Sequence, residues 1–262
     1  MRHLRALALI VLAAGLLFVG CTLYPPIAGS GILVEGTADF ENFSIVRADS
    51  GFEVTVIADT AYSVTVTVDD NILEHVRMEL EGNELRIGLD PWYSYQDVTL
   101  KALVTMPVLN GIKLSGASSL FVVDGPALPP ASVFKADVSG ASSLKIPHIT
   151  ADLFELELSG ASTASLGLTS AAVRFDVSGA SRLTAGGSAV EVLADVSGAS
   201  EVDLKALSGG NGELELSGAS RMWVTLAGLA NADLSGGSTL YYRGGLAWGH
   251  LDISGGSRLK TY

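Results

Sequence analysis

The sequence is poor in cysteine, histidine and basic residues. Among its 262 residues there is one cysteine, Cys21, and only four histidines. No two histidines have the spacing of metal ligands, so we expect neither disulfides nor a cofactor in the folded part. There are 16 Lys and Arg residues against 28 Asp and Glu, which gives a net charge of −12. Because nucleic-acid phosphates are bound by Lys and Arg, this acidic balance argues against a nucleic-acid partner.

A long apolar run stands near the amino terminus. After the basic start MRHLR comes ALALIVLAAGLLFVG, which is short for a membrane span and is typical of a signal peptide over residues 1–20. Cys21 then completes LFVGC, which resembles a bacterial lipobox and implies a lipoprotein with a palmitate-bearing cysteine. We expect residues 21–33 to be a lipidated tether to the membrane. Alternatively, Cys21 is incidental to an ordinary signal peptide or an anchor helix.

The second half of the chain repeats a four-residue motif. Ser-Gly-Ala-Ser stands at 115–118, 139–142, 159–162, 178–181, 197–200 and 217–220, and Ser-Gly-Gly-Ser at 235–238 and 254–257. Successive motifs begin 24, 20, 19, 19, 20, 18 and 19 residues apart, which indicates a repeat architecture. With 30 glycines and 48% hydrophobic residues, the composition also suits a turn-dense β protein and is too apolar for disorder.

Apolar residues alternate on both sides of every motif. The positions three and one before the first serine, and five after it, are apolar in all eight copies. This period of two indicates strands, and the glycine between them suits a corner. Such short strands bury their apolar face only by stacking on copies of themselves, about 4.8 Å apart. The sequence therefore predicts an all-β fold, a right-handed parallel β-helix of about 19–20 residues per coil, with Val177, Val196 and Leu216 as successive neighbours.

The repeated serines resemble a nucleophile turn, but their number argues against that role. An active-site serine is singular, whereas sixteen serines occupy equivalent corner positions in this chain. We interpret them as two ladders of hydroxyls, bonded to one another or to the local backbone.

Residues 34–110 lack the motif and precede the repeat of residues 111–262. Alternating FEVTVIA and YSVTVTV predict strands, and RMELEGNELRIGL predicts a hairpin that turns at Gly82-Asn83. DDNILEHV predicts one helical turn with Asp69 or Asp70 as its N-cap. This region forms either the first coils or a separate β cap, and some cap is expected because a solenoid end exposes unpaired backbone. At the other end, Tyr241, Tyr242 and Trp248 or another chain are candidates to cover the last coil.

An ordered set of short motifs resembles bacterial auto-transporter adhesin head domains, the GIN domain family. The matching segments are Phe52–Val56, Asp70–Leu73, Leu85–Leu89, Pro107–Ile112 and the corners. The resemblance covers about residues 38–260 and implies a right-handed β-helix at the cell surface or in the periplasm. It brings no catalytic residues with it.

A column of acidic residues is a candidate cation site. Two positions before each motif stand Lys113 and then Asp137, Glu157, Asp176, Asp195, Glu215, Asp233 and Asp252. Stacked carboxylates repel, by roughly 1 kcal/mol per pair in water, so a bound cation such as Ca²⁺, corner hydroxyls or nearby arginines must offset them. The alternative, which we favour, is a solvated face that keeps the sheet soluble.

The segment DPWYSYQD groups Trp92, Tyr93 and Tyr95 in an expected loop. Exposed aromatic side chains stack on sugars or anchor a protein partner, which makes these residues a candidate ligand site. The alternative is a loop that packs its aromatic rings over the end of the helical turn.

These observations favour a non-enzymatic lipoprotein of the bacterial cell envelope, lipid-anchored and extracytoplasmic, with a glycan or protein ligand. A structural spacer or homo-oligomerisation rod is the alternative. A polysaccharide lyase or hydrolase is less favoured, because enzymes of this architecture interrupt their repeat to form a cleft and this chain does not.

Overall fold

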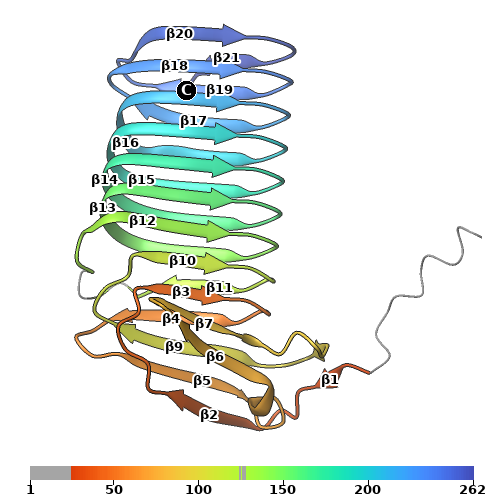
Figure 1. Ribbon diagram of the computed structural model, residues 1–262. Helices are drawn as coiled ribbons and strands as arrows, with labels where there is room; N and C mark the ends of the chain where they lie inside the picture. Colours follow the sequence, from red (N-terminus) through yellow and green to blue (C-terminus); the bar gives the residue numbers. More distant parts are fainter. Residues whose placement is uncertain (1–24, 124, 126–127) are drawn as a thin grey trace, which may run out of the picture.

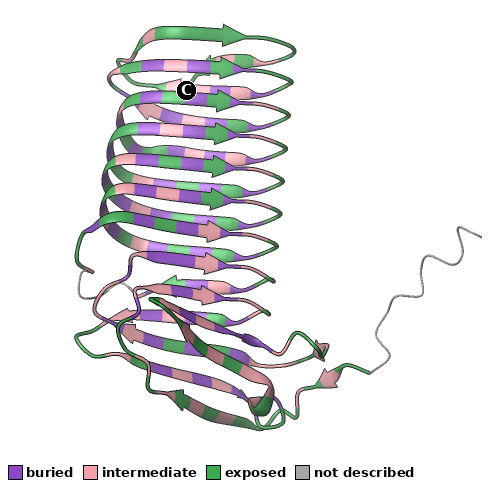
Figure 2. Cartoon of the chain, in the orientation of Figure 1, coloured by how far each residue is buried: buried purple, intermediate pink, exposed green. Residues whose placement is uncertain are grey.

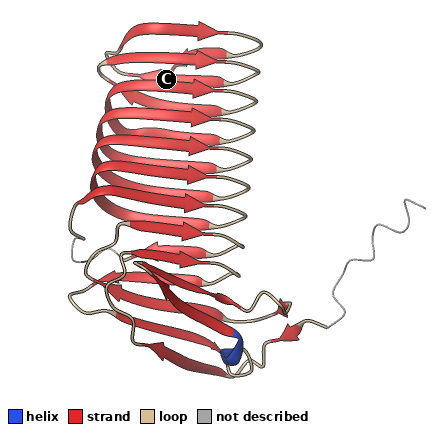
Figure 3. Cartoon of the chain, viewed as in Figure 1, coloured by secondary structure: helices blue, strands red, loops and turns tan. Residues whose placement is uncertain are grey.

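The computed structural model describes residues 25–123, 125 and 128–262. The chain winds into a rod of stacked coils that rise in a right-handed sense from the amino-terminal end to the carboxyl-terminal end (Figure 1). Nearly all of these residues lie in strands or in the loops between them, and the only helix among them is one short turn (Figure 3). None of the described helices is long and apolar enough to cross a membrane. The expected parallel β-helix is confirmed.

The central coils consist of long strands that run from one corner to the next. These are β13 (Ser143–Leu158), β14 (Thr163–Val177), β15 (Arg182–Val196) and β16 (Glu201–Leu216). In the other coils the strand is interrupted, giving β10 (Gly111–Leu114), β11 (Ser119–Val122), β12 (Ala131–Val138), β17 (Arg221–Leu226), β18 (Leu229–Leu234), β19 (Thr239–Arg243), β20 (Ala247–Ile253) and β21 (Arg258–Thr261). Neighbouring coils pair in parallel, so each residue lies above its counterpart in the coil below.

Like residues form columns inside the rod, as the repeat requires. Val177 pairs with Val196, and Val196 pairs with Leu216, and all three are buried. Wider parts of the interior are filled by aromatic rings: Phe134 and Phe154 stack with centroids 5.3 Å apart. The alternation of buried and exposed residues along each strand is visible in Figure 2. Burial of these columns is the main source of stability of the rod.

The Ser-Gly-Ala-Ser motifs form the corners of the rod. The corner glycines have positive φ, for example +77° at Gly179, and a Cβ there would overlap the carbonyl oxygen of Gly160 in the coil below. That same oxygen accepts a 2.8 Å hydrogen bond from the amide of Ala180, so the ladder continues through the bend. Glycine is therefore required by both the backbone angle and the close approach. The corner interpretation is confirmed.

The corner serines are less fully hydrogen-bonded than two continuous ladders would be. The second serine of the motif is buried in seven of the eight corners. At the corner of Ser238 this hydroxyl reaches the next coil: the Ser238 Oγ atom lies 3.2 Å from the Ser257 Oγ atom. In contrast, the Oγ atoms of Ser142, Ser200 and Ser220 have no hydrogen-bond partner. The serines fit the corner by size, and only some of them bond across it.

Residues 34–110 extend the rod and also close it. β3 (Ile45–Ala48) and β4 (Glu53–Ala58) form a coil that pairs in parallel with β10 and β11. Below this coil β7 (Glu84–Leu89) and β9 (Leu100–Met106) continue the two faces in parallel. β6 (Val76–Glu81) then pairs antiparallel with β7, while β5 (Ser63–Asp69) pairs antiparallel with β9 and β2 (Leu33–Ala38) with β5. The region thus supplies a first coil and an antiparallel cap.

The hairpin is confirmed, and the helical turn forms with a different start. Strands β6 and β7 turn at Gly82-Asn83. The turn is a 3₁₀ helix, η1 (Leu73–His75), and its N-cap is Ile72, without a side-chain cap. Asp69 and Asp70 are therefore not the N-cap.

The Asp69 carboxylate is occupied elsewhere, by backbone amides distant in the sequence. It accepts hydrogen bonds of 2.7 Å from the N–H groups of Gly31 and Thr99. Beside it β1 (Ile27–Ala28) pairs in parallel with β8 (Tyr95–Gln96). The second half of the expected tether is thus bound to the cap.

Candidate functional site

The acidic column lies in register on the outer face of the rod. Lys113, Asp137, Glu157, Asp176, Asp195, Glu215, Asp233 and Asp252 occupy successive coils, each paired with the next. The column also continues below Lys113, onto Arg47 of β3 and Arg86 of β7. One line of residues is therefore basic at the capped end and acidic over the rest of its length. The basic part escaped the sequence analysis because β3 and β7 lack the motif that defines the column.

Two carboxylates of the column have a nitrogen partner on the adjacent column. The Lys135 Nζ atom lies 2.8 Å from a Glu157 oxygen, and the His250 Nε2 atom lies 3.1 Å from an Asp233 oxygen. The glutamate beside Lys135 raises the pKa of that lysine. Two of the arginines near the corners pair with other glutamates: Arg174 lies 3.8 Å from Glu155, and Arg182 lies 3.5 Å from Glu201.

Among the described residues, the carboxylates in the middle of the column have no such partner. Asp176, Asp195 and Glu215 line a shallow hollow of about 330 Å³. Partial burial, followed by the charges of Asp195 and Glu157, raises the pKa of Asp176 above its usual value. In residues 25–123, 125 and 128–262, however, no three His, Cys, Asp or Glu side chains converge as metal ligands. A cation along this column therefore stays a hypothesis, and the solvated face stays the alternative.

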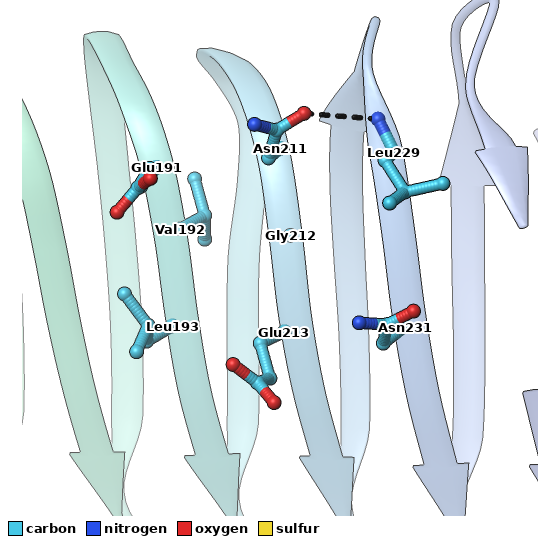
Figure 4. A pocket seen from close by; sticks show the side chains of 8 residues that line it. All are labelled: Glu191, Val192, Leu193, Asn211, Gly212, Glu213, Leu229 and Asn231. Atoms are coloured by element: carbon cyan, nitrogen blue, oxygen red, sulfur yellow. Dashed lines mark hydrogen bonds between the residues drawn. The ribbon is translucent and has the colours of Figure 1, made fainter. Parts of the chain in front are cut away.

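A second shallow hollow, of about 190 Å³, lies beside the column across β15, β16 and β18 (Figure 4). Its walls carry Glu191, Glu213 and Asn231, and the Asn211 Oδ1 atom accepts a 3.0 Å hydrogen bond from the amide of Leu229. Both hollows are open surface features of a regular sheet.

The aromatic loop divides between the two expected roles. Tyr93 and Tyr95 pack on His75 at the end of η1, with ring centroids 4.7 and 5.8 Å away, as expected for a loop that covers a helix end. Trp92 does not join them and is 84% exposed, while Tyr93 is 49% exposed. Of the three residues singled out in the sequence, two therefore meet on His75, and Trp92 is the one that is mostly exposed to solvent.

Asp90 fixes this loop. Its carboxylate accepts a 3.1 Å hydrogen bond from the amide of Trp92 and lies 3.0 Å from Arg77, and its carbonyl accepts a 3.0 Å bond from the Tyr95 hydroxyl. The Trp92 amide and then Arg77 hold the pKa of Asp90 below its ordinary value. The exposed indole therefore stands on a loop with a defined conformation.

A further aromatic cluster lies near the carboxyl-terminal end of the rod, on the face formed by β17 and β19, which does not carry the acidic column. The rings of Trp223 and Tyr241 stack with centroids 4.8 Å apart, Lys205 lies over Trp223, and Lys260 lies over Tyr241. Sequence analysis did not single it out, although these positions are equivalent relative to their corners. Because each ring face is covered by a ring or an ammonium group, the cluster stabilises the surface of the rod.

Cys21, the expected lipid attachment site, lies outside the described residues.

Comparison with known proteins relates most of the described chain to one family. Residues 42–245 match the family described as "Putative auto-transporter adhesin, head GIN domain". The chain belongs to this family. Comparison with curated proteins found no match.

Solved structures show the same fold at low sequence identity. The structure of a putative adhesin from Parabacteroides merdae has a TM-score of 0.84 and 14% identity, over 91% of this chain and 100% of the other. A putative adhesin from Parabacteroides distasonis gives 0.80 and 17%, over 90% of this chain and 100% of the other. A structure from the same species described as a putative lipid binding protein gives 0.77 and 14%, over 91% and 100%.

Proposed function

We propose that this GIN-domain protein is a non-enzymatic head module of the bacterial cell envelope. It is anchored outside the cytoplasm by lipid on Cys21 and binds a glycan or a protein. The description of the family and of its structural neighbours as adhesins supports the surface location and the binding role. The position of β1, which we call the strap, supports a short anchor. It pairs with β8 in the cap and begins only six residues after Cys21.

The observation that carries the binding role is the exposure of Trp92. An indole that is 84% exposed is rare on a stable surface, and aromatic side chains of this kind dominate the energetics of many interfaces. Asp90 and Arg77 hold the loop, so little conformational entropy is lost when a ligand packs against it. Trp92 and Tyr93 are accordingly the proposed ligand contacts, and Tyr95 supports them.

Binding is tested on an array of bacterial and host glycans with residues 22–262, which contain every described element. We expect a Trp92-dependent signal, and Trp92→Ala should weaken it about tenfold or more. Trp223→Ala is the matched control, because Trp223 lies on another face against Tyr241 and should leave binding unchanged.

Other results of the same experiment separate the alternatives. If the array is blank but an envelope protein is captured in a Trp92-dependent way, the ligand is a protein. If neither binds, the ligand-binding proposal is wrong and the spacer gains support. Turnover of an acidic polysaccharide would contradict the non-enzymatic assignment.

The anchor is tested separately by mass spectrometry of the mature amino terminus in the native host. A diacylglyceryl, palmitate-bearing Cys21 is expected, and Cys21→Ala should release the protein from the membrane fraction. An unmodified cysteine, or a retained leader, would contradict the lipid anchor.

A further inference from the structure

The carboxyl-terminal coil of the rod is open. This open coil consists of β20, the corner at residues 254–257, and β21. On one side β20 pairs with β18, and β21 pairs with β19. No strand of the described residues pairs with the other side of either one. Both faces of the rod therefore end in unpaired backbone N–H and C=O groups, which readily template a further strand.

The open coil also leaves its share of the core exposed. Leu251 and Ile253 are 37% and 42% exposed, whereas Ala232 and Leu234, directly below them, are 1% and 2% exposed. Tyr242 and Trp248 contact each other edge to face and cover part of this end, as expected from the sequence. Tyr241 does not, because it stacks on Trp223 outside the rod. Figure 2 shows the contrast between β20 and the coils below it.

The opposite end of the rod is a poorer match for this coil. There β6 and β2 are the outermost strands, beyond the parallel coils. In a head-to-tail stack β21 would face β2, which runs parallel to it, but β20 would face β6, which runs antiparallel to β7 and to the strands above it, so the two faces would not continue alike. Head-to-tail stacking would also leave one open coil at the end of every assembly, whereas a two-fold contact between two open coils covers both.

Charge decides how two open coils fit. On the outer side β20 carries His250 and Asp252, and β21 carries Arg258 and Lys260. Two-fold contacts can pair β20 with β20 and β21 with β21, or each β20 with the other copy's β21. The first arrangement sets Arg258 and Lys260 of one copy against Arg258 and Lys260 of the other, and like charges on facing strands are destabilising. The second sets acidic Asp252 against a basic strand.

We propose that two copies of the chain associate tip to tip through the open coil. The two-fold axis passes through the corner at right angles to the rod, and β20 of each copy pairs antiparallel with β21 of the other. Inward-facing residues must oppose inward-facing ones, so Leu251 lies opposite either Leu259 or Thr261. The first register sets Asp252 opposite Arg258, and the second sets it opposite Lys260. Either register buries Leu251 and Ile253 and extends both faces across the contact.

Sedimentation velocity of residues 22–262 over a range of concentrations tests the contact. A reversible monomer–dimer equilibrium is expected. Asp252→Arg should raise the dissociation constant about tenfold or more, because symmetry makes the change occur twice in each dimer. Asp195→Arg is the matched control: it makes the same change in the same column, in the middle of the rod, and should leave the equilibrium unchanged.

A charge exchange tests the pairing of β20 with β21. The double variant Arg258→Asp, Lys260→Asp should likewise raise the dissociation constant of its own dimer. Mixing it with Asp252→Arg should restore dimers, because both contacts of the mixed pair then join opposite charges. Circular dichroism of each variant confirms that its fold is retained.

Three results would overturn the proposal. They are a monomeric native chain at every concentration, a dimer that Asp252→Arg leaves intact or Asp195→Arg disrupts, and a mixture that fails to associate.

Discussion

The two faces of the rod end differently at its two ends. At the amino-terminal end, β7 and β9 have parallel neighbours on one side and antiparallel neighbours on the other, and Phe43 and Ile72 are fully buried there. At the carboxyl-terminal end, β20 and β21 have neighbours on one side only, among the described residues, and Leu251 and Ile253 are partly exposed.

This difference shows what a repeat can and cannot do by itself. Each coil offers the next one the same backbone edge and the same apolar columns, so repetition extends the rod but never closes it. Closure requires strands that reverse direction, and these lie in residues 34–110, which lack the motif. Among the described residues no such reversing strand pairs with β20 or β21.

The largest expected effect compares two leucines in one column. Leu214 and Leu251 both face the interior, with Ala232 between them, but Leu214 is 1% exposed and Leu251 is 37% exposed. Leu214→Ala should lower the free energy of unfolding by about 3 kcal/mol through the cavity it leaves. Leu251→Ala should cost less than about 1 kcal/mol in dilute solution. Urea denaturation measures both. Equal losses would mean that the open end is covered, and a loss at Leu251 that grows with protein concentration would indicate the tip contact.

The next comparison separates the corner from the cap turn. Gly179 and Gly82 both have positive φ, at +77° and +62°, but only at Gly179 does a Cβ meet the coil below. We expect Gly179→Ala to cost about 2 kcal/mol or more, and Gly82→Ala about 1 kcal/mol, which is the conformational part alone. Denaturation midpoints test this. Similar losses would show that backbone conformation, and not the close stacking of coils, makes glycine necessary.

At the closed end, Asp69 should make stability depend on pH. The amides of Thr99 and then Gly31 hold the pKa of Asp69 below its usual value. Its contribution is therefore complete above the unfolded pKa of about 3.9 and is lost as the pH falls through the lower folded value. Asp69→Asn should lower the thermal midpoint at pH 7, and the difference from the native chain should shrink in acid. Asp39→Asn, on an exposed residue, is the control. A difference that is constant with pH would contradict this role.

The smallest effect is expected within the serine ladder. Ser200 is buried and its hydroxyl has no partner, whereas the Ser238 hydroxyl lies 3.3 Å from the Leu216 carbonyl oxygen and 3.2 Å from Ser257. Ser200→Ala should change the free energy of unfolding by less than about 0.5 kcal/mol, or stabilise the rod, and Ser238→Ala should cost about 1 kcal/mol. If both substitutions cost the same, an unseen partner such as water satisfies Ser200.

The parts of the fold that repeat were predictable from the sequence. Corners, inner columns and the acidic column all follow from aligning the eight motifs, because stacking converts equal spacing along the chain into neighbours in space. The coil of β3 and β4 was only one of two alternatives for its region, because its corner lacks the motif. Its corner is Asp49-Ser50-Gly51, in which Ser50 takes the positive φ of +64° that glycine has elsewhere.

The site was predictable only where its residues are close in sequence. The aromatic loop was found because Trp92, Tyr93 and Tyr95 are near neighbours. The packing of two of these rings over the end of the helical turn was one of the two expected roles, but His75 itself was not identified as their partner, because it lies about twenty residues away in the sequence. The N-cap expected at Asp69 failed for the same reason, since its carboxylate binds Gly31 and Thr99 instead.

The strap at β1 and the open coil stand at opposite ends of the molecule (Figure 1). With coils about 4.8 Å apart, the stack from β7 to β20 measures about 45 Å. Two chains joined at their tips would therefore form a rod about 90 Å long, with the proposed lipid attachment point of each chain at its outer end. Chains anchored side by side in one flat bilayer would have their open coils facing in the same direction and could not make that contact. The tip-to-tip dimer therefore suits a bridge between two membrane surfaces that face each other.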